Sequence, residues 1–399
     1  MKILIISQYF WPEEFRVNDL ALSLVKKGHE VSVLTGIPNY PQGTYFNGYK
    51  FKFSIENFKS IKVFRVPITS RGKSNFRLFL NYISFLISGI IFSLFHREKY
   101  DSIFAVNFSP ITSVIPAIIF KYKYGTKINI WVQDLWPESV SSTGKINSKI
   151  INNILNILVK FIYKNFDRIF IQSKGFIKSI ISKGINSNKI IYLPNWAENF
   201  YLNEEKLDKN KFKSIFSKSV FKIMFAGNIG EAQDFESILK AIYNLRENIK
   251  IQWVFVGDGS KKEWFSKKID ELSLNDNVLF IDRMPVIEMP SLFWHADIML
   301  ASLKNEEIFS ITIPSKIQSY MASGKPILSM ISGETLNIIN DSKCGLSCDS
   351  GDFNNLQENV LKAYNMTDQE LRSMGLNGKK YYLKHFEKTI IIKKLLNYI

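Results

Sequence analysis

Residues 314–328 read Pro-Ser-Lys-Ile-Gln-Ser-Tyr-Met-Ala-Ser-Gly-Lys-Pro-Ile-Leu. A proline followed by a serine is typical of a helix start, and the later glycine and proline end the helix before an apolar strand begins. The first turn of a helix exposes unpaired N–H groups, which suit a phosphate or a diphosphate. The stretch therefore predicts a helix-to-strand joint of an α/β domain. Two interpretations stay open, an ordinary structural joint and an anion site at the helix start.

Short apolar runs recur on both sides of this joint, with helical patterns between them. In the first half of the chain we expect strands at 3–7, 30–35, 60–66, 102–106, 128–132 and 168–172. In the second half we expect them at 222–226, 253–256, 278–281, 298–301 and 326–330. Strands that alternate with helices indicate an α/β fold with parallel sheets. A length of 399 residues suits two such domains.

The order of residues in 319–327, Ser-Tyr-Met-Ala-Ser-Gly-Lys-Pro-Ile, resembles the donor-sugar helix of family-4 retaining glycosyltransferases. The Pro-Ser-Lys lead-in is similar to the branch that transfers N-acetyl-fucosamine-type sugars in O-antigen and capsule biosynthesis. The resemblance covers nearly the whole chain and implies a GT-B fold, in which two Rossmann-like domains face a central cleft. It implies an acceptor domain at 1–197, a nucleotide-sugar domain at 198–377, and a helix at 378–399 that packs back toward the first domain.

The resemblance implies a donor site in the second domain. Four segments are implied to form this site. They are the helix that begins at 315, a glycine turn after 222–226, a second turn after 253–256, and a segment similar to the Gly-Arg-x-Pro motif that holds the base. The implied donor ligands are Gly227, Asn228, Ile229, Gly230, Gln233, Gly257, Asp258, Gly259, Arg283, Met284, Pro285, Glu307, Pro314, Ser315, Lys316 and Ser319. A plain glycine turn and a surface arginine are the structural alternatives for these segments.

Several positions depart from the usual pattern of the family. The common arginine, lysine and paired glutamates are replaced at Asn228, near Asp234, and at Ile311 and Ser319. Glu306 and Glu307 lie a few residues upstream and can substitute if the loop is longer. A lysine at a helix start is electrostatically unfavourable unless an anion is bound nearby. Lys316, together with Ser315, is therefore the expected replacement at the donor phosphates.

Residues 129–138 read Asn-Ile-Trp-Val-Gln-Asp-Leu-Trp-Pro-Glu. Asp134 follows an apolar strand, at the edge where open parallel sheets bind ligands. The segment is similar to the same transferase branch, and the family commonly has a histidine or an acid near this point that faces the reacting sugar. Asp134 is therefore the first catalytic candidate, as a sugar-orienting group or as electrostatic support for a cationic transition state, with a helix N-cap as the alternative. Glu13 and Lys316 complete the predicted catalytic set.

Acceptor contacts are expected from loops that follow strands of the first domain, because such loops often carry function. Arg16 suits an acceptor phosphate, and a solvated loop is the alternative for residues 13–18. The predicted acceptor ligands are Arg16, Asn18, Asn39, Tyr40, Asn107, Ser109, Trp136 and Glu138.

The net charge of +16 indicates an anionic partner. Because no zinc finger, RNA-binding signature or long basic arm is present, lipid head groups and phosphorylated substrates are favoured over nucleic acid. Residues 78–95 are nearly all apolar and follow six basic residues with no acid between them, which favours docking on anionic lipid. Burial against the first sheet is the alternative, and a true membrane span would interrupt the α/β alternation. Residues 145–164 are amphipathic, and a helix with a solvated basic face is the favoured interpretation.

Two cysteines and four scattered histidines predict neither a disulfide framework nor a metal site. The apolar start of the chain indicates a buried strand rather than a signal peptide. We therefore expect a cytoplasmic protein that associates peripherally with the inner face of the cytoplasmic membrane.

The resemblance implies transfer of a sugar, with retention of configuration, from a UDP-sugar to a polyprenyl-diphosphate-linked glycan in surface polysaccharide biosynthesis. The expected sugar is an acetamido-deoxyhexose, and no cofactor or metal is expected. A nucleotide-sugar epimerase on the same fold and a non-catalytic protein that binds anionic surfaces are the alternatives. A dehydrogenase is disfavoured, because no complete Gly-x-Gly-x-x-Gly motif follows the first strand.

Overall fold

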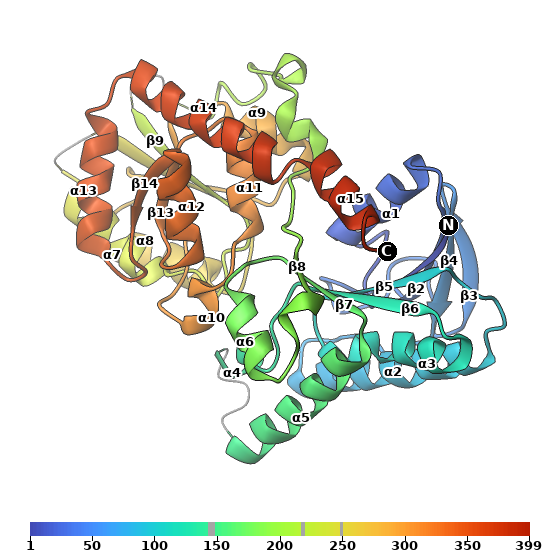
Figure 1. Ribbon diagram of the computed structural model, residues 1–399. Helices are drawn as coiled ribbons and strands as arrows, with labels where there is room; N and C mark the ends of the chain where they lie inside the picture. The colour runs from blue at the N-terminus through green and yellow to red at the C-terminus, as the bar shows by residue number, and fades with distance from the viewer. Residues whose placement is uncertain (143–147, 217–219, 248–249) are drawn as a thin grey trace. The chain divides into compact units, whose positions relative to one another are not determined.

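The computed structural model describes residues 1–142, 148–216, 220–247 and 250–399. They form two compact units (Figure 1), one comprising Met1–Pro194 with Ile391–Ile399 and the other Asn195–Ile390. The division after Pro194 lies three residues before the boundary predicted at 197. Of the predicted C-terminal segment 378–399, only the last nine residues belong to the first unit.

The first unit is built on an eight-stranded sheet in the order β3-β4-β2-β1-β5-β6-β7-β8. The strands are β1 (Lys2–Ile6), β2 (Glu30–Gly36), β3 (Ser54–Phe58), β4 (Ile61–Val66), β5 (Ser102–Asn107), β6 (Lys127–Val132), β7 (Arg168–Ile171) and β8 (Ile190–Tyr192). Neighbouring strands are parallel except β3 and β4, which form an antiparallel pair at one edge. The central strands are buried along almost their whole length because helices cover both faces of the sheet.

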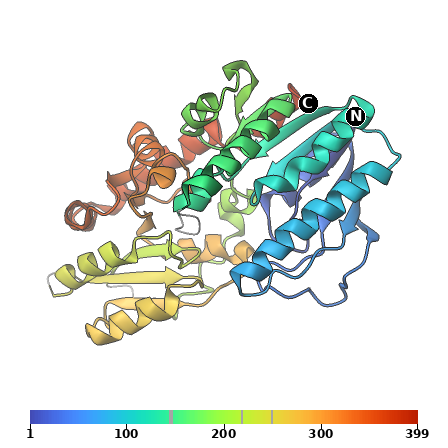
Figure 2. The same cartoon turned by 90° about the horizontal axis from the view of Figure 1, so that it is seen from below.

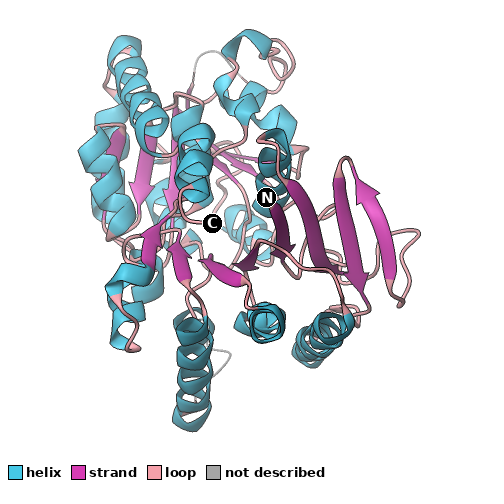
Figure 3. Ribbon diagram, turned by 45° about the vertical axis from the view of Figure 1, so that its right-hand side comes forward, coloured by secondary structure: helices cyan, strands magenta, loops and turns pink. Residues whose placement is uncertain are grey.

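Helices cover the two faces of this sheet in separate layers (Figures 1 and 3). One layer holds α1 (Arg16–Lys26) and α15 (Lys388–Leu396); the other holds α2 (Asn75–Phe95), α3 (Ile115–Tyr124) and α5 (Lys149–Asn165). Figure 2 shows α2, α3 and α5 from below. The short helices α4 (Glu138–Ser142) and α6 (Phe176–Ser182) complete the unit. Beyond α15, Tyr398 packs its ring 6.1 Å from that of Phe170 in β7, which fastens the end of the chain to this unit.

The second unit has a wholly parallel six-stranded sheet in the order β11-β10-β9-β12-β13-β14. Its strands are β9 (Phe221–Ala226), β10 (Ile251–Val256), β11 (Val278–Ile281), β12 (Ile298–Ser302), β13 (Ile327–Met330) and β14 (Gly345–Cys348). Its helices are α7 (Phe235–Leu245), α8 (Lys262–Glu271), α9 (Met289–Phe293), α10 (Glu307–Ser310), α11 (Ser315–Ala322), α12 (Glu334–Ser342), α13 (Phe353–Tyr364) and α14 (Asp368–His385).

Alternate side chains of β9 enter different hydrophobic cores on the two faces of this second sheet. Met224 and Ala226 join a core that contains Tyr320 of α11. Phe225 joins the core on the other face, where its ring lies 5.4 Å from that of Phe235 in α7. This division fixes which face of the sheet α11 covers, and so where its first turn points.

The structure confirms the predicted α/β class with two parallel-sheet domains, and each predicted strand is present within two residues of its expected bounds. The sequence pattern did not predict β3, β8 and β14. These are edge strands, and their partly exposed residues lack the continuous apolar run that marks the central strands.

Candidate functional site

Two glycine turns interlock at the ends of β9 and β10. The N–H of Gly227 donates to Val256 O at 2.9 Å, and the N–H of Ile229 donates to Asp258 O at 2.9 Å. A Cβ atom on Gly257 would lie 2.0 Å from Gly227 O, at a φ of +135°. Glycine is therefore required at residue 257, both for the close approach of the two turns and for the backbone conformation.

Lys316, in the first turn of α11, reaches back to the turn that follows β9. Its Nζ atom lies 3.4 Å from Gln233 Oε1 and 3.5 Å from the point where a Cβ on Gly227 would stand. Burial lowers the pKa of Lys316 to about 7. No carboxylate among the described residues forms an ion pair with this ammonium group. The structure thus brings together Lys316, Gln233 and Gly227, three of the predicted donor ligands.

Tyr320 fixes the position of α11 against β9. Its hydroxyl accepts a hydrogen bond from Ala226 N at 3.0 Å and lies 3.1 Å from Ala226 O, to which it donates. Tyr320 lies one helical turn beyond Lys316, so these bonds hold the start of α11 near the glycine turn. The sequence pattern does not identify this role, although a tyrosine in a buried helix normally needs a hydrogen-bond partner.

The acidic side chains that were expected to replace the paired glutamates point to water. Glu306 and Glu307 are both exposed, at the start of α10. The hydroxyl of Ser319, at the second glutamate position, lies 3.4 Å from Ser315 O within α11. Glu307 therefore lacks the enclosure expected of a donor ligand, and the structure offers no enclosed acid at this place among the described residues.

Two lysines that the sequence pattern does not single out flank the glycine turn at 227–230. Lys261 Nζ lies 3.0 Å from Glu231 Oε2, and Lys304 Nζ contacts the other oxygen of the same carboxylate. Hydrogen bonds from Lys304 and Lys261 hold the pKa of Glu231 below its usual range. The backbone N–H of Lys304 also donates to Ala232 O at 2.9 Å. These lysines place positive charge beside the turn in which Asn228 stands where the resemblance implies an arginine.

The predicted segment Arg283-Met284-Pro285 follows β11. Arg283 is exposed, and Met284 packs against the core that contains Tyr320. Asp282, just before Arg283, forms an ion pair with Lys262 at 2.5 Å. This segment thus lies on the surface at the end of β11, beside the strand that carries the second glycine turn.

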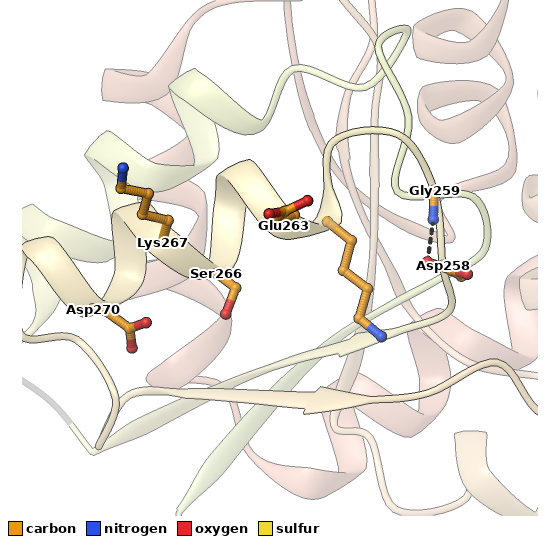
Figure 4. Close-up of a pocket in the computed structure, with 7 residues that line it drawn as sticks. Asp258, Gly259, Glu263, Ser266, Lys267 and Asp270 are labelled. Carbon is orange, nitrogen blue, oxygen red and sulfur yellow. Dashed lines mark hydrogen bonds between the residues drawn. The ribbon is translucent and has the colours of Figure 1, made fainter.

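An open hollow of about 570 Å³ runs from the second glycine turn along α8 (Figure 4). Its lining comprises Asp258, Gly259, Lys262, Glu263, Ser266, Lys267 and Asp270. Three acids against two lysines disfavour a diphosphate at this place. In the turn itself, the N–H of Gly259 donates to Asp258 Oδ1 at 2.8 Å. We therefore do not assign the donor phosphates to this hollow, although it shares Asp258 and Gly259 with the predicted donor set.

In the first unit, Asp134 stands at the carboxyl end of β6. Its N–H donates to Asn107 O, at the end of the neighbouring β5, at 3.3 Å. Burial raises the pKa of Asp134 to about 7, and an interaction with the Ser109 hydroxyl opposes this shift. Ser109 Oγ in turn accepts a hydrogen bond from Trp136 Nε1 at 2.9 Å. The structure thus brings together Asp134, Asn107, Ser109 and Trp136. Among the described residues, the side-chain polar atoms of the fully buried Asn107 have no hydrogen-bond partner.

Glu13, predicted as catalytic, orders the loop that follows β1. Its Oε1 accepts hydrogen bonds from the backbone N–H groups of Asn39 at 2.9 Å and Tyr40 at 2.7 Å, and its Oε2 accepts from Phe10 at 3.3 Å. Burial outweighs these bonds and raises the pKa of Glu13 to about 7. The side chain is only 2 % exposed. In this structure Glu13 thus positions the loop, and its catalytic role stays a prediction.

Three predicted acceptor ligands also use their polar groups within the unit. Asn18 accepts from Trp11 N at 2.9 Å and donates to Glu13 O at 2.7 Å. Asn39 donates its side-chain amide to Ile37 O at 2.7 Å and is 1 % exposed. Glu138 Oε1 accepts from Lys183 Nζ and from Ser179 Oγ, each at 2.5 Å. The side chains of Asn18, Asn39 and Glu138 thus hold loops and short helices together, and their roles as acceptor ligands stay predictions.

Arg71 forms a polar cluster that the sequence pattern does not predict. Its Nη1 donates to the Tyr9 hydroxyl at 2.9 Å, and its guanidinium carbon lies 5.2 Å from the centroid of the Tyr40 ring. The Tyr82 hydroxyl interacts with both Tyr9 and Arg71, and the Asp134 charge contributes to the raised pKa of Tyr82, of which burial is the main cause. Tyr82 is therefore the member of this cluster that senses the predicted catalytic carboxylate, and Arg71 and Tyr9 join it through Tyr82. No carboxylate among the described residues forms an ion pair with Arg71.

Of the other predicted acceptor ligands, Tyr40 is exposed beside Arg71, and Arg16 is the first residue of α1. Among the described residues, no group of three or more His, Cys, Asp or Glu side chains could hold a metal ion. Cys344 and Cys348 are buried thiols, and burial raises the pKa of both.

The two halves of the chain match two family models. Residues 14–198 match Glycosyltransferase Family 4, and residues 207–381 match Glycosyl transferases group 1. Both halves are glycosyltransferase domains. The matches meet between residues 198 and 207, close to the division of the two compact units.

This glycosyltransferase is similar along most of its length to two curated proteins. It is 26 % identical to the probable glycosyltransferase WbjE of Pseudomonas aeruginosa, over 72 % of each chain. It is 24 % identical to the putative colanic acid biosynthesis glycosyl transferase WcaI of Escherichia coli K12, over 81 % of this chain and 82 % of the relative.

The fold of the glycosyltransferase is also similar to the folds of solved structures. The sucrose-phosphate synthase of Thermosynechococcus elongatus superposes with a TM-score of 0.78 at 14 % identity, covering 99 % of this chain and 97 % of the other. The Anabaena protein HepE, solved in complex with UDP and glucose, superposes with a TM-score of 0.69 at 15 % identity, covering 100 % and 98 %. These matches show the GT-B fold.

Proposed function

We propose that this glycosyltransferase moves a sugar from a UDP-sugar to a lipid-linked glycan acceptor during surface polysaccharide biosynthesis. The observation that carries the proposal is the ammonium group of Lys316, held beside the Gly227 turn with no carboxylate partner in the part of the chain that the structure describes. The UDP bound to HepE supports the donor, and the similarity to WcaI, a putative glycosyl transferase of colanic acid biosynthesis, supports the pathway class. The resemblance of the Pro-Ser-Lys helix favours an acetamido-deoxyhexose as the sugar.

On the donor side, we assign the diphosphate to the first turn of α11 and the turn at 227–230. The helix start supplies N–H groups and Lys316 supplies a charge, which together offset the two negative phosphates. Lys261 and Lys304, which both form ion pairs with Glu231, add positive charge beside the same turn. Protein cations of this kind take the place of a metal ion, so we propose transfer without a bound metal or cofactor.

In the proposed reaction, the bond between the anomeric carbon and the diphosphate oxygen breaks, and the electron pair leaves with the diphosphate. The acceptor hydroxyl forms the new bond on the same face of the sugar, and its proton passes to the departing diphosphate. This path retains configuration. Ionised Asp134 stabilises the positive charge that develops on the sugar ring. Glu13 holds the loop after β1 in place and does not itself react.

On the acceptor side, we assign the polyprenyl diphosphate to the surroundings of Arg71. The contacts of the Arg71 guanidinium with Tyr9 and Tyr40 leave it able to form paired hydrogen bonds to a phosphate. Tyr40, exposed beside Arg71, offers an aromatic surface for a sugar ring. An acceptor of this kind is anchored in a membrane, and we propose that the enzyme works at the inner face of the cytoplasmic membrane.

Calorimetric titration with UDP, in the presence of a chelator, tests the donor assignment. We expect wild type to bind UDP and Lys316→Ala to bind about tenfold more weakly, a loss of about 1.4 kcal/mol. Lys362→Ala, on the exposed face of α13, is the matched control and should bind as wild type does. Absence of UDP binding by wild type would overturn the assignment of the nucleotide.

Incubation of the enzyme with a UDP-sugar in the absence of acceptor separates transfer from isomerisation. A transferase leaves the sugar nucleotide unchanged apart from slow hydrolysis. Conversion to a new epimer, detected by nuclear magnetic resonance, would instead establish a nucleotide-sugar epimerase.

A further inference from the structure

One side of the first unit exposes a stripe of large apolar side chains along α2. Its members, between 51 % and 78 % exposed, are Phe76, Phe79, Ile87, Ile91, Leu94 and Phe95. They recur at helical spacing over the whole length of α2. Among the described residues, α2 is also the one helix long and apolar enough to cross a membrane. So much contiguous apolar surface is rare on a soluble monomer and marks an interaction site.

A second stripe lies on α5. Ile150, Ile154, Ile157 and Phe161 are between 49 % and 73 % exposed, and they also recur at helical spacing. Other apolar residues of the same helix, Val159, Ile162 and Tyr163, are buried in the unit. The predicted solvated basic face is therefore corrected: the solvent side of α5 carries isoleucines as well as lysines. Residues 145–147 of that predicted segment lie outside the described residues.

The two stripes belong to one layer of helices. In that layer α3 contacts both α2 and α5. Figures 2 and 3 show the three helices together on the same face of the first sheet. Tyr122 of α3, which is 72 % exposed, adds an aromatic ring between the stripes. The apolar surface thus extends over three neighbouring helices.

The positive charge of these three helices indicates which kind of partner covers the layer. No aspartate or glutamate occurs in α2, α3 or α5, whereas six basic residues do, namely Arg77, Lys121, Lys123, Lys149, Lys160 and Lys164. A second copy of the same surface would bring basic groups against basic groups. Lys121 is already paired with Asp167. Anionic lipid head groups would instead pair with the other basic residues while the apolar side chains enter the acyl boundary.

The opposite side of α2 is fastened to its own domain by hydrogen bonds. Asn81 Nδ2 donates to Thr69 O at 2.6 Å, and Thr69 N donates to Ser84 Oγ at 2.9 Å. One turn further on, Ser88 Oγ donates to Pro67 O at 2.7 Å. A membrane span would break these bonds and leave their polar groups in hydrocarbon. The helix is therefore suited to lie on a bilayer, not to cross it.

We propose that the exposed faces of α2 and α5, with Tyr122 between them, dock the first unit on an anionic lipid bilayer, with the helices lying along its surface. The proposal deepens the function inferred above, since a lipid-linked acceptor resides in such a bilayer. It stands, however, on the apolar stripes and on the absence of acids within α2, α3 and α5, and it does not depend on the identity of the donor.

Co-sedimentation with vesicles tests the docking surface. The probes are vesicles of phosphatidylcholine alone and vesicles that contain equal parts of phosphatidylcholine and phosphatidylglycerol. Full-length wild type should bind the mixed vesicles strongly and the neutral ones weakly. Ile154→Asp/Ile157→Asp, which places two acids in the α5 stripe, should bind the mixed vesicles at least about tenfold more weakly, a loss of about 1.4 kcal/mol.

Leu376→Asp/Leu383→Asp is the matched control, because both leucines are exposed on α14 in the second unit. This variant should bind vesicles as wild type does. A circular dichroism spectrum and a thermal midpoint like those of wild type show that both double variants are folded. UDP binding, assigned to the second unit, is measured separately and distinguishes a failure of docking from a failure of the donor assignment. Equal binding of wild type to both kinds of vesicle, or unchanged binding of the α5 variant, would overturn the proposal. So would a wild-type dimer that the α5 substitutions dissociate.

Discussion

The ammonium group of Lys316 lies 3.5 Å from the centroid of the Phe225 ring, at the strand that leads into the Gly227 turn. A ring face attracts a cation, but it does not replace the water that burial removes. The pKa of Lys316 is accordingly lowered to about 7. An arriving diphosphate would restore the missing counter-charge, which links donor binding to the protonation of this one residue.

We therefore expect the affinity for a UDP-sugar to depend on pH. A bound anion raises the pKa of Lys316, which is about 7 without ligand. Binding therefore takes up a proton at pH values above about 7. Affinity should be highest below pH 7 and should fall as the pH rises through and above it. Titration calorimetry in two buffers of different ionisation enthalpy measures the proton uptake. Lys316→Met should bind more weakly and lose most of the pH dependence; an unchanged slope would show that another group titrates.

The raised pKa of Asp134 predicts an acid limb in the rate profile. If the carboxylate stabilises a cationic transition state, kcat should rise with pH through about 7. Ser109→Ala removes an interaction that favours the ionised form, so it should move this limb to higher pH. Asp134→Asn should lower kcat by at least about a hundredfold and leave UDP affinity nearly unchanged. Wild-type kcat in Asp134→Asn would remove the residue from the catalytic set.

Substitution of Gly257 tests the two interlocked turns. In Gly257→Ala, the new Cβ would meet Gly227 O at 2.0 Å and must push the donor loop aside. We expect UDP binding to weaken by at least about tenfold and the thermal midpoint to fall. Gly125→Ala is the control, since its Cβ would meet nothing within 4 Å. The only cost to stability is then the positive φ of residue 125, about 1–2 kcal/mol. It should leave UDP binding intact; equal effects of the two substitutions on binding would argue against a specific role for the turn.

Arg71 should act on the acceptor and not on the donor. Arg71→Lys keeps the charge but loses the planar pair of donors, so we expect the KM for a lipid-linked acceptor to rise by at least about tenfold. The dissociation constant for UDP should stay at its wild-type value. Arg372→Lys, an exposed residue of α14, serves as the comparison. A loss of UDP affinity in Arg71→Lys, with no change in acceptor KM, would refute the acceptor assignment.

The strands and the α11 joint could be predicted because their signals are local. Each central strand is an apolar run, and the residues Pro-Ser-Lys by themselves predict the helix start at Ser315. The edge strand β3 escaped prediction because its alternating exposure gives a weaker pattern than a buried run. Lys316 and Asp134 could be singled out for the same reason. Lys316 lies at the start of the predicted helix and Asp134 lies just after a predicted strand.

The functions of the loop residues could not be predicted in this way. Glu13 bonds to backbone groups of Asn39 and Tyr40, 26 and 27 residues away, and Arg71 bonds to Tyr9 across 62 residues. No local pattern reveals such partners. An acid in a loop after a strand therefore looks like a ligand for substrate until the fold shows that the loop itself occupies its oxygens.

The sequence by itself determined the two α/β domains, the helix start at Lys316 and the acid-free, basic character of α2, α3 and α5, because spacing and composition are properties of neighbouring residues. Tertiary structure alone decided that Lys316 lies by the Gly227 turn, that Glu13 holds a loop, and that the isoleucines of α5 point to solvent. Those outcomes depend on which strands pair and which helix face meets the sheet, and packing over long separations in the chain settles both.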